Sequence, residues 1–250
     1  MFVITLLPML YFSSCDVLTG ILNDYGQGQP GGLTNAEVSQ GLKAALKEGA
    51  RFASKNASQE NGYFNNPIVD IRILLPPELR KAERSIRRVP VIGDKLVDNL
   101  ITAMNEGAEK AAAEAAPIFI NAITSMTISD AMNILKGDST AATQYLRRTT
   151  SNELEAKFQP VLKDALDDVG ATRYYSSLKK AIGKYNRTPF VQQLEVEVNE
   201  LPVLEEYATD RAMDGLFKLV AVEEQKIRDN PFQYGEQIIR KVFGSLKSSS

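Results

Sequence analysis

Apolar side chains recur every three or four positions along most of this chain, which is the period of an amphipathic α-helix. In the first such segment Val38, Leu42 and Ala45 share one face. The same period predicts helices at residues 34–56, 78–88, 94–126, 127–137, 138–148, 150–170, 172–185, 203–229 and 231–243. The pattern therefore predicts an all-α fold, a multi-helix bundle of about eight or nine helices.

Polar caps and prolines set the ends of several predicted helices. Thr34 with Glu37, and Thr127 with Asp130, have the spacing of capping boxes. Pro117 is expected to kink the long helix 94–126, because its ring clashes with the preceding turn. We expect the helices 138–148 and 150–170 to be separate.

Two segments lack the helical period. Residues 63–75 contain a β-branched, partly alternating stretch, which predicts at most a short β-hairpin or an extended segment. Residues 186–202 alternate only weakly, so the sequence is compatible with a loop, a helix or a strand there.

The N-terminal residues are typical of a lipoprotein signal. Residues 2–12 are almost wholly apolar, the length of a signal-peptide core and too short to span a bilayer. Ser13, Ser14 and Cys15 follow and resemble a bacterial lipobox, in which the thiol receives a diacylglyceryl group. Because no Lys or Arg precedes the apolar run, a frayed apolar terminus with a chance cysteine is the alternative.

These patterns divide the chain into four parts. Residues 1–15 are the predicted signal peptide and lipobox, residues 16–33 a flexible linker rich in Gly, Gln, Asn and Asp, residues 34–245 a single helical domain, and residues 246–250 a disordered tail. Two closely packed helical lobes are the alternative for the domain. The predicted location is the periplasmic side of a bacterial cell envelope, lipid-anchored to the inner or the outer membrane.

The amino-acid composition excludes several kinds of catalytic and metal-binding site. The chain has no histidine and a single cysteine, which excludes Ser-His-Asp and Cys-His catalysis, imidazole zinc sites and an internal disulfide. We therefore expect no cofactor and no metal. The 29 basic and 31 acidic residues give a net charge of −2, and Trp is absent, so nucleic acid is not an expected partner.

Glu223 is the strongest candidate for a functional side chain. In the helix 203–229 it falls near the middle of an apolar face, between Leu216 and Ile227. A carboxylate there must be paired, protonated or facing a cavity. It is a pKa-shifted acid, a ligand anchor, a structural ion pair with an Arg or Lys of another helix, or a residue at the edge of the face that reaches solvent. Glu224, by contrast, is predicted to form an ordinary surface pair with Arg228.

Four further residues are candidate ligand contacts. Glu109 lies among alanines on the helix 94–126, with Asn105 one turn earlier, and is either packed or solvated. Arg147 and Arg148 end the predicted helix 138–148, where they either bind an anionic ligand, pair with Glu223 or Glu109, or complement the helix dipole.

Six segments of the chain carry a resemblance to a known family. They are residues 41–46 (GLKAAL), 105–119 (NEGAEKAAAEAAPIF), 126–135 (MTISDAMNIL), 141–150 (AATQYLRRTT), 214–231 (DGLFKLVAVEEQKIRDNP) and 241–244 (KVFG). Together these segments are similar to the bacterial domain of unknown function 4197. The resemblance implies a helical protein that often carries a secretion or lipoprotein signal, and it implies no activity and no site residues.

Three functions follow from these observations. The first is a membrane-tethered, non-enzymatic module that binds an envelope protein or another envelope component. The second is a carrier that encloses an amphipathic small molecule between kinked helices, with Glu223 or an arginine at the polar end. The third is a hydrolase that uses Glu223 and Glu109 as paired carboxylates.

Overall fold

The computed structural model describes residues 33–88, 93–168, 170–189 and 196–247. These residues form nine α-helices and no β-strand, which confirms the predicted all-α bundle. The helices are α2 (Asn35–Ala57), α3 (Pro77–Arg87), α4 (Gly93–Ala112), α5 (Ala115–Ser125), α6 (Ile128–Lys136), α7 (Ala141–Asp168), α8 (Ala171–Asn186), α9 (Leu204–Asp229) and α10 (Gln237–Lys247), with short 3₁₀ turns η1 (Val198–Glu200) and η2 (Pro231–Gln233). The predictions for the signal peptide, Cys15 and nearly all of the linker lie outside the described residues.

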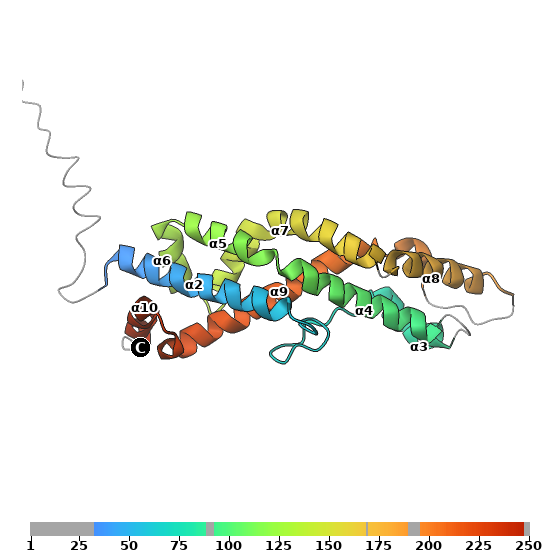
Figure 1. Cartoon of the computed structure of the whole chain (residues 1–250), viewed down its shortest axis with the longest axis horizontal. Coiled ribbons are helices and arrows are strands. Elements are labelled where there is room, and N and C mark those ends of the chain that lie inside the picture. Colours follow the sequence, from blue (N-terminus) through green and yellow to red (C-terminus); the bar gives the residue numbers. More distant parts are fainter. Residues whose placement is uncertain (1–32, 89–92, 169, 190–195, 248–250) are drawn as a thin grey trace, which may run out of the picture.

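The helices form an elongated bundle around α9 (Figure 1). Helix α9 contacts α2, α4 and α7, and its predicted apolar face, which includes Ala212, Leu216 and Ile227, is buried. The start of α2 lies at one end of the bundle together with α6 and α10, and we call this the α10 end. Helices α3 and α8 lie at the opposite end, the α8 end.

Both predicted capping boxes are confirmed. Thr34 accepts the backbone N–H of Glu37, whose carboxylate accepts the N–H of Thr34 in return. Thr127 and Asp130 do the same at the start of α6. Each box satisfies two helix N–H groups that would otherwise lack a partner, so the local sequence alone fixes these two helix starts.

The predicted single helix 94–126 is wrong. The chain breaks between α4 and α5, at Ala113 and Glu114, before Pro117 rather than at it. In a helix, a proline ring clashes with the carbonyl of the residue four positions earlier. For Pro117 this residue is Ala113, so the helix breaks there. Pro117 itself lies in the first turn of α5, where a missing N–H costs nothing.

The predicted division between residues 148 and 150 is also wrong, because α7 is one helix of 28 residues. The hydroxyls of Thr149, Thr150 and Ser151 donate to carbonyls four residues earlier, at Tyr145, Leu146 and Arg147. Hydroxyls used in this way do not cap a new helix start, so the α7 helix continues through them.

The last helix begins later than predicted. Residues 231–233 form η2, Tyr234 is extended, and α10 covers Gln237–Lys247 instead of residues 231–243. The extended backbone at Tyr234 lets its hydroxyl reach back to Glu223 of α9 at 2.7 Å. Among the described helices none is by itself long and apolar enough to cross a membrane, and the joined pair α5 and α6, which passes on length and composition, is bent by 105°.

Candidate functional site

Glu223 is buried, with 5% of its surface exposed. The Tyr234 hydroxyl donates to Oε1, and Lys226 Nζ lies 3.5 Å from Oε2, which accepts no hydrogen bond from the described residues. Gly49 of α2 faces the aliphatic part of the Glu223 side chain, since a Cβ there would lie 3.8 Å from Glu223 Cγ. Burial first, and the bond to Glu223 second, raise the pKa of Tyr234. The charged partner therefore comes from the same helix, not from another helix as one interpretation of the sequence expected.

Glu224 is not the surface residue that the sequence predicted. It is 5% exposed, and its carboxylate accepts the backbone N–H groups of Ala142 and Thr143 at 3.0 and 2.9 Å. Arg228 donates to the same carboxylate and also to the carbonyl of Ile134 at the end of α6. Because an acidic group at a helix N-terminus pairs with free N–H donors, Glu224 caps α7 from a neighbouring helix.

Glu109 and Asn105 hold the segment between α2 and α3 against α4. Glu109 is half-buried and accepts the N–H of Tyr63 at 3.1 Å. Asn105 is fully buried; it accepts the N–H of Ile73 at 2.9 Å and donates to its carbonyl at 2.8 Å. Residues 71–75 alternate between buried and exposed side chains, as an extended segment does, but this side chain and not a second strand pairs with them.

Arg147 and Arg148 lie exposed in the first half of α7, not at a helix end as predicted. Arg147 pairs with Asp214 of α9 at 2.8 Å and lies over the ring of Phe217. Arg148 lines a shallow pocket of about 170 Å³ between α6 and α7, whose other lining residues include Asp130. The structure therefore does not gather the predicted candidates into one site: apart from Arg148, they contact different elements.

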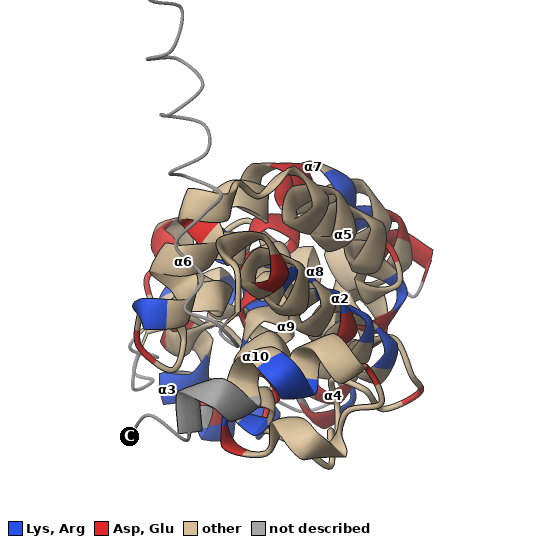
Figure 2. Cartoon of the chain, turned by 90° about the vertical axis from the view of Figure 1, so that its left-hand side faces the viewer, with Lys and Arg blue, Asp and Glu red and all other residues tan. Residues whose placement is uncertain are grey.

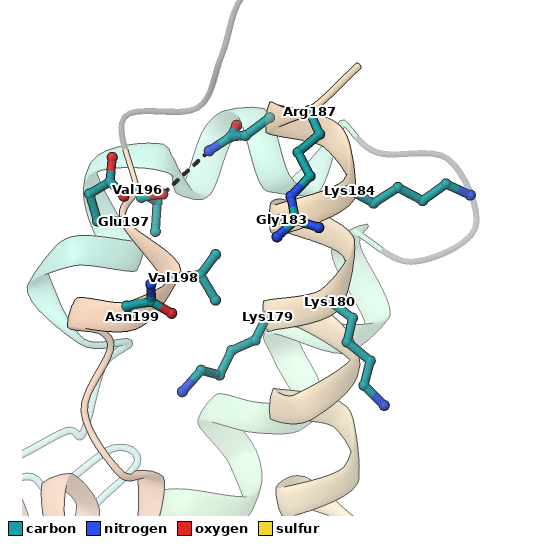
Figure 3. A pocket seen from close by; sticks show the side chains of 10 residues that line it. Lys179, Lys180, Gly183, Lys184, Arg187, Val196, Glu197, Val198 and Asn199 are labelled. Carbon is teal, nitrogen blue, oxygen red and sulfur yellow. Dashed lines mark hydrogen bonds between the residues drawn. The ribbon is translucent and has the colours of Figure 1, made fainter.

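A groove that the sequence did not reveal lies beside the second half of α8 (Figure 3). It has a volume of about 550 Å³. Its lining consists of Lys179, Lys180, Gly183, Lys184, Asn186 and Arg187 on one side, and Val196, Glu197, Val198 and Asn199 on the other. The second wall belongs to the stretch 186–202, in which hydrophobic residues follow no clear helical or strand period. The sequence therefore did not predict the groove.

The orientation of the basic side chains is visible in Figure 3. Lys179 points toward the segment 196–199, whereas Lys180 and Lys184 lie on the other flank of the helix. The Arg187 side chain runs back along α8, so that its guanidinium lies beside Gly183. Asn186 donates to the carbonyl of Val196 at 3.3 Å and so ties the second wall to the helix.

The four cations of the groove have no acidic partner among the described residues. In the parts of the chain that the structure describes, none of Lys179, Lys180, Lys184 and Arg187 forms a salt bridge, although Lys179 lies over the ring of Tyr175. Among the described residues that line the groove, Glu197 is the only acidic one. The local potential is therefore positive, although the whole chain carries a net charge of −2.

More basic residues lie at this end of the bundle than those of the groove. Helix α3 exposes Arg80, Lys81 and Arg84, followed by Arg88. At the opposite end, acidic and basic residues are interspersed (Figure 2). The described residues contain no group of three or more Cys, Asp or Glu side chains placed to hold a metal ion. An anionic ligand is thus the chemistry that the α8 groove suits best.

Comparison with known proteins gives a single family. The model described as "Protein of unknown function (DUF4197)" matches residues 32–244, most of the chain. No curated protein and no solved structure matches.

Proposed function

The chain belongs to the DUF4197 family of proteins of unknown function, and we propose that it is a non-enzymatic binding module attached to a bacterial envelope membrane through a lipid on Cys15. The proposed binding surface is the groove beside α8. One observation carries the proposal: this groove is lined by four cations without salt bridges among the described residues, whereas the other candidate polar groups are mostly used in contacts between helices.

The position of the groove supports a tethered module. Helix α2, the first described helix, begins at the α10 end, and the groove lies at the α8 end (Figure 1). An anchor that precedes α2 would hold the α10 end near the membrane. The length of the bundle would then separate the groove from the anchor, because the α9 helix alone, with 26 residues, is roughly 39 Å long.

The hydrolase alternative receives no support from the two carboxylates on which it depends. Such chemistry needs two acidic groups across one cleft, roughly 5–10 Å apart. Glu109 hydrogen-bonds to the backbone at Tyr63, whereas Glu223 bonds to Tyr234. The two groups share no partner, and neither lines the α8 groove.

The carrier alternative receives no support from the mainly apolar pocket that the described residues form beside α9. The pocket beside Glu224 and Arg228 is otherwise lined mainly by apolar residues, including Leu46 and Phe243. Its volume is about 10 Å³, whereas a site for a drug-sized ligand has roughly 300–1,000 Å³. At most about one water molecule fits there.

The attachment is tested by fractionating cells that express the full chain or Cys15→Ser. We expect the wild type in the membrane fraction and the variant in the soluble envelope fraction, because the acyl chains supply the membrane affinity. Equal distribution of the two proteins would contradict the proposed anchor.

The binding surface is tested by site-specific photo-crosslinking in intact cells. A crosslinking residue at Lys180 is compared with one at Lys110, an exposed lysine of α4 outside the groove. Discrete adducts are expected from position 180 alone, and Arg187→Gln should reduce them. Adducts that are equal at both positions, or that are unaffected by Arg187→Gln, would contradict a binding role for the groove.

A further inference from the structure

We infer that the α8 groove is a binding site for a phosphate-bearing ligand. The inference rests on the proposed function and adds the chemical class of the ligand. It depends on three features of the groove: the spread of its cations around α8, their lack of counter-ions among the residues that the structure describes, and its size.

The spacing of the basic residues distributes them around one side of the helix. At roughly 100° per residue, the side chains at 179, 180, 184 and 187 cover an arc of about 140°. Gly183 lies inside this arc, which leaves the helix surface hollow between the cations. A Cβ at residue 183 would meet only Val198 Cγ2, at 3.9 Å, so this hollow forms the floor of the groove.

Structural roles do not account for all four cations. Basic residues in the last turn of a helix stabilise the helix dipole, which explains Lys184 and Arg187. Lys179 and Lys180 precede that turn, where the dipole effect has fallen away. Elsewhere, basic residues such as Arg87 and Arg228 have acidic partners within 3 Å. The groove cations form no such pair in the described residues, which keeps them available to a ligand.

Phosphate matches this arrangement better than a carboxylate does. A phosphate monoester carries about 1.5–2 negative charges at neutral pH and three acceptor oxygens. Arginine binds two of these oxygens with its planar fork, and lysine acts as a point charge from a flexible stem. One carboxylate would leave most of the positive charge uncompensated, since Glu197 is the only acidic residue among the described part of the lining.

The size of the groove points to more than an inorganic ion. Its volume of about 550 Å³ is in the range of small-molecule sites. Val196 and Val198 give its second wall apolar surface, and none of the lining residues that the structure describes is an aromatic that could stack on a base. The ligand is therefore a phosphorylated small molecule or the headgroup of a phospholipid.

Binding is measured by calorimetry with the full chain carrying Cys15→Ser, because a lipid on Cys15 would itself insert into every vesicle. The soluble probe is inorganic tripolyphosphate, and the membrane probe is a phosphatidylcholine vesicle with or without phosphatidylglycerol. Binding of tripolyphosphate identifies the soluble source, whereas binding only of vesicles with phosphatidylglycerol identifies the headgroup. Either result supports the inference. Failure of both probes, or equal affinity for citrate, which carries carboxylates in place of phosphates, would overturn it.

Two groove variants and one control localise the binding. Lys179→Gln/Arg187→Gln should weaken binding by at least about tenfold, because it removes charge-assisted hydrogen bonds. Gly183→Leu should weaken it as well, since it fills the hollow and leaves the charge unchanged. Arg51→Gln/Lys110→Gln makes the same charge change on α2 and α4, outside the groove, and should bind like the wild type. Similar losses in the control and in Lys179→Gln/Arg187→Gln would overturn the inference.

The outcome also separates this inference from the proposed function. If crosslinking from residue 180 captures a partner but no phosphate probe binds, the phosphate assignment fails and the binding module stands. If the probes bind but crosslinking from residue 180 gives no specific adduct, the groove remains a phosphate site, and the role as a partner-binding module fails.

Discussion

The charged side chains of α9 and those of α8 differ in what surrounds them. On α9 the Glu224 carboxylate accepts two backbone N–H groups, the Thr143 hydroxyl and Arg228. On the second half of α8, four cations line a groove without a salt bridge to any described residue. Buried charge is tolerated only where it is paired, whereas exposed charge needs no partner. The first arrangement serves the fold, and the second leaves its charges free for a ligand.

This difference separates stability from binding in the two regions. Removing a group from the α9 network leaves buried donors without partners, so the free energy of unfolding should fall. Removing a cation from the α8 groove leaves nothing unpaired, so only ligand binding should change. Each substitution below tests one side of that contrast.

The largest loss is expected for Glu224→Ala. The change leaves the N–H groups of Ala142 and Thr143 and the Arg228 side chain without their acceptor, and should lower the free energy of unfolding by about 3 kcal/mol. Urea unfolding measures the change. Glu155→Ala, which removes an exposed glutamate of α7, is the control and should have little effect. A loss for Glu224→Ala as small as that of the control would remove the capping role of Glu224.

A smaller loss is expected for Asn105→Ala. This change leaves the N–H and carbonyl of Ile73 buried without partners and should cost about 2 kcal/mol. The matched control is Asn99→Ala, which changes an exposed asparagine of the same helix. If both variants unfold at the same urea concentration, the segment 71–75 does not depend on the Asn105 side chain.

Tyr234→Phe should cost less again, about 1 kcal/mol, because it removes the single hydrogen bond to Glu223. Burial raises the pKa of Tyr234 and also that of Tyr63. A group with a raised folded-state pKa stabilises the fold below its ordinary pKa, about 10 for tyrosine, and loses that contribution as the pH rises through the folded value. The free energy of unfolding should therefore fall above about pH 10.

The alkaline fall should be shallower in Tyr234→Phe, because one of the buried hydroxyls is absent. Unfolding curves recorded at several alkaline pH values give both slopes. A wild-type slope equal to that of the variant would show that Tyr234 ionises alike in the folded and unfolded states.

Features fixed by neighbouring residues could be predicted from the sequence. The capping boxes at Thr34 and Thr127, and the place of Glu223 on the apolar face of α9, depend on spacing within a few residues. The role of Glu224 depends on a contact with Thr143, which lies 81 residues away, so no local pattern predicts it. A helix was also predicted to begin at Thr150, because threonine hydroxyls often cap helix starts. Inside α7 the Thr150 hydroxyl instead donates to the carbonyl of Leu146, one turn earlier.

The groove was predictable only in part. The spacing of Lys179, Lys180, Lys184 and Arg187 places four cations on one side of a helix, and this signal is present in the sequence. The second wall could not be predicted, because residues 196–199 have no regular period and reach α8 through the bond from Asn186 to the Val196 carbonyl. Without that wall, the cations look like an ordinary solvated helix face.

The smallest effect on stability is expected for Lys180→Gln. This variant tests whether the groove cations of α8, unlike the α9 carboxylates, contribute little to the free energy of unfolding. Lys180 is exposed and forms no salt bridge among the described residues, so its loss should change the free energy of unfolding by less than about 0.5 kcal/mol. Because like charges at 184 and 187 lie one and two turns away, the change should be neutral or slightly stabilising, and smaller at high salt. A loss above about 1 kcal/mol would show that the groove cations hold the fold together, as the α9 carboxylates do.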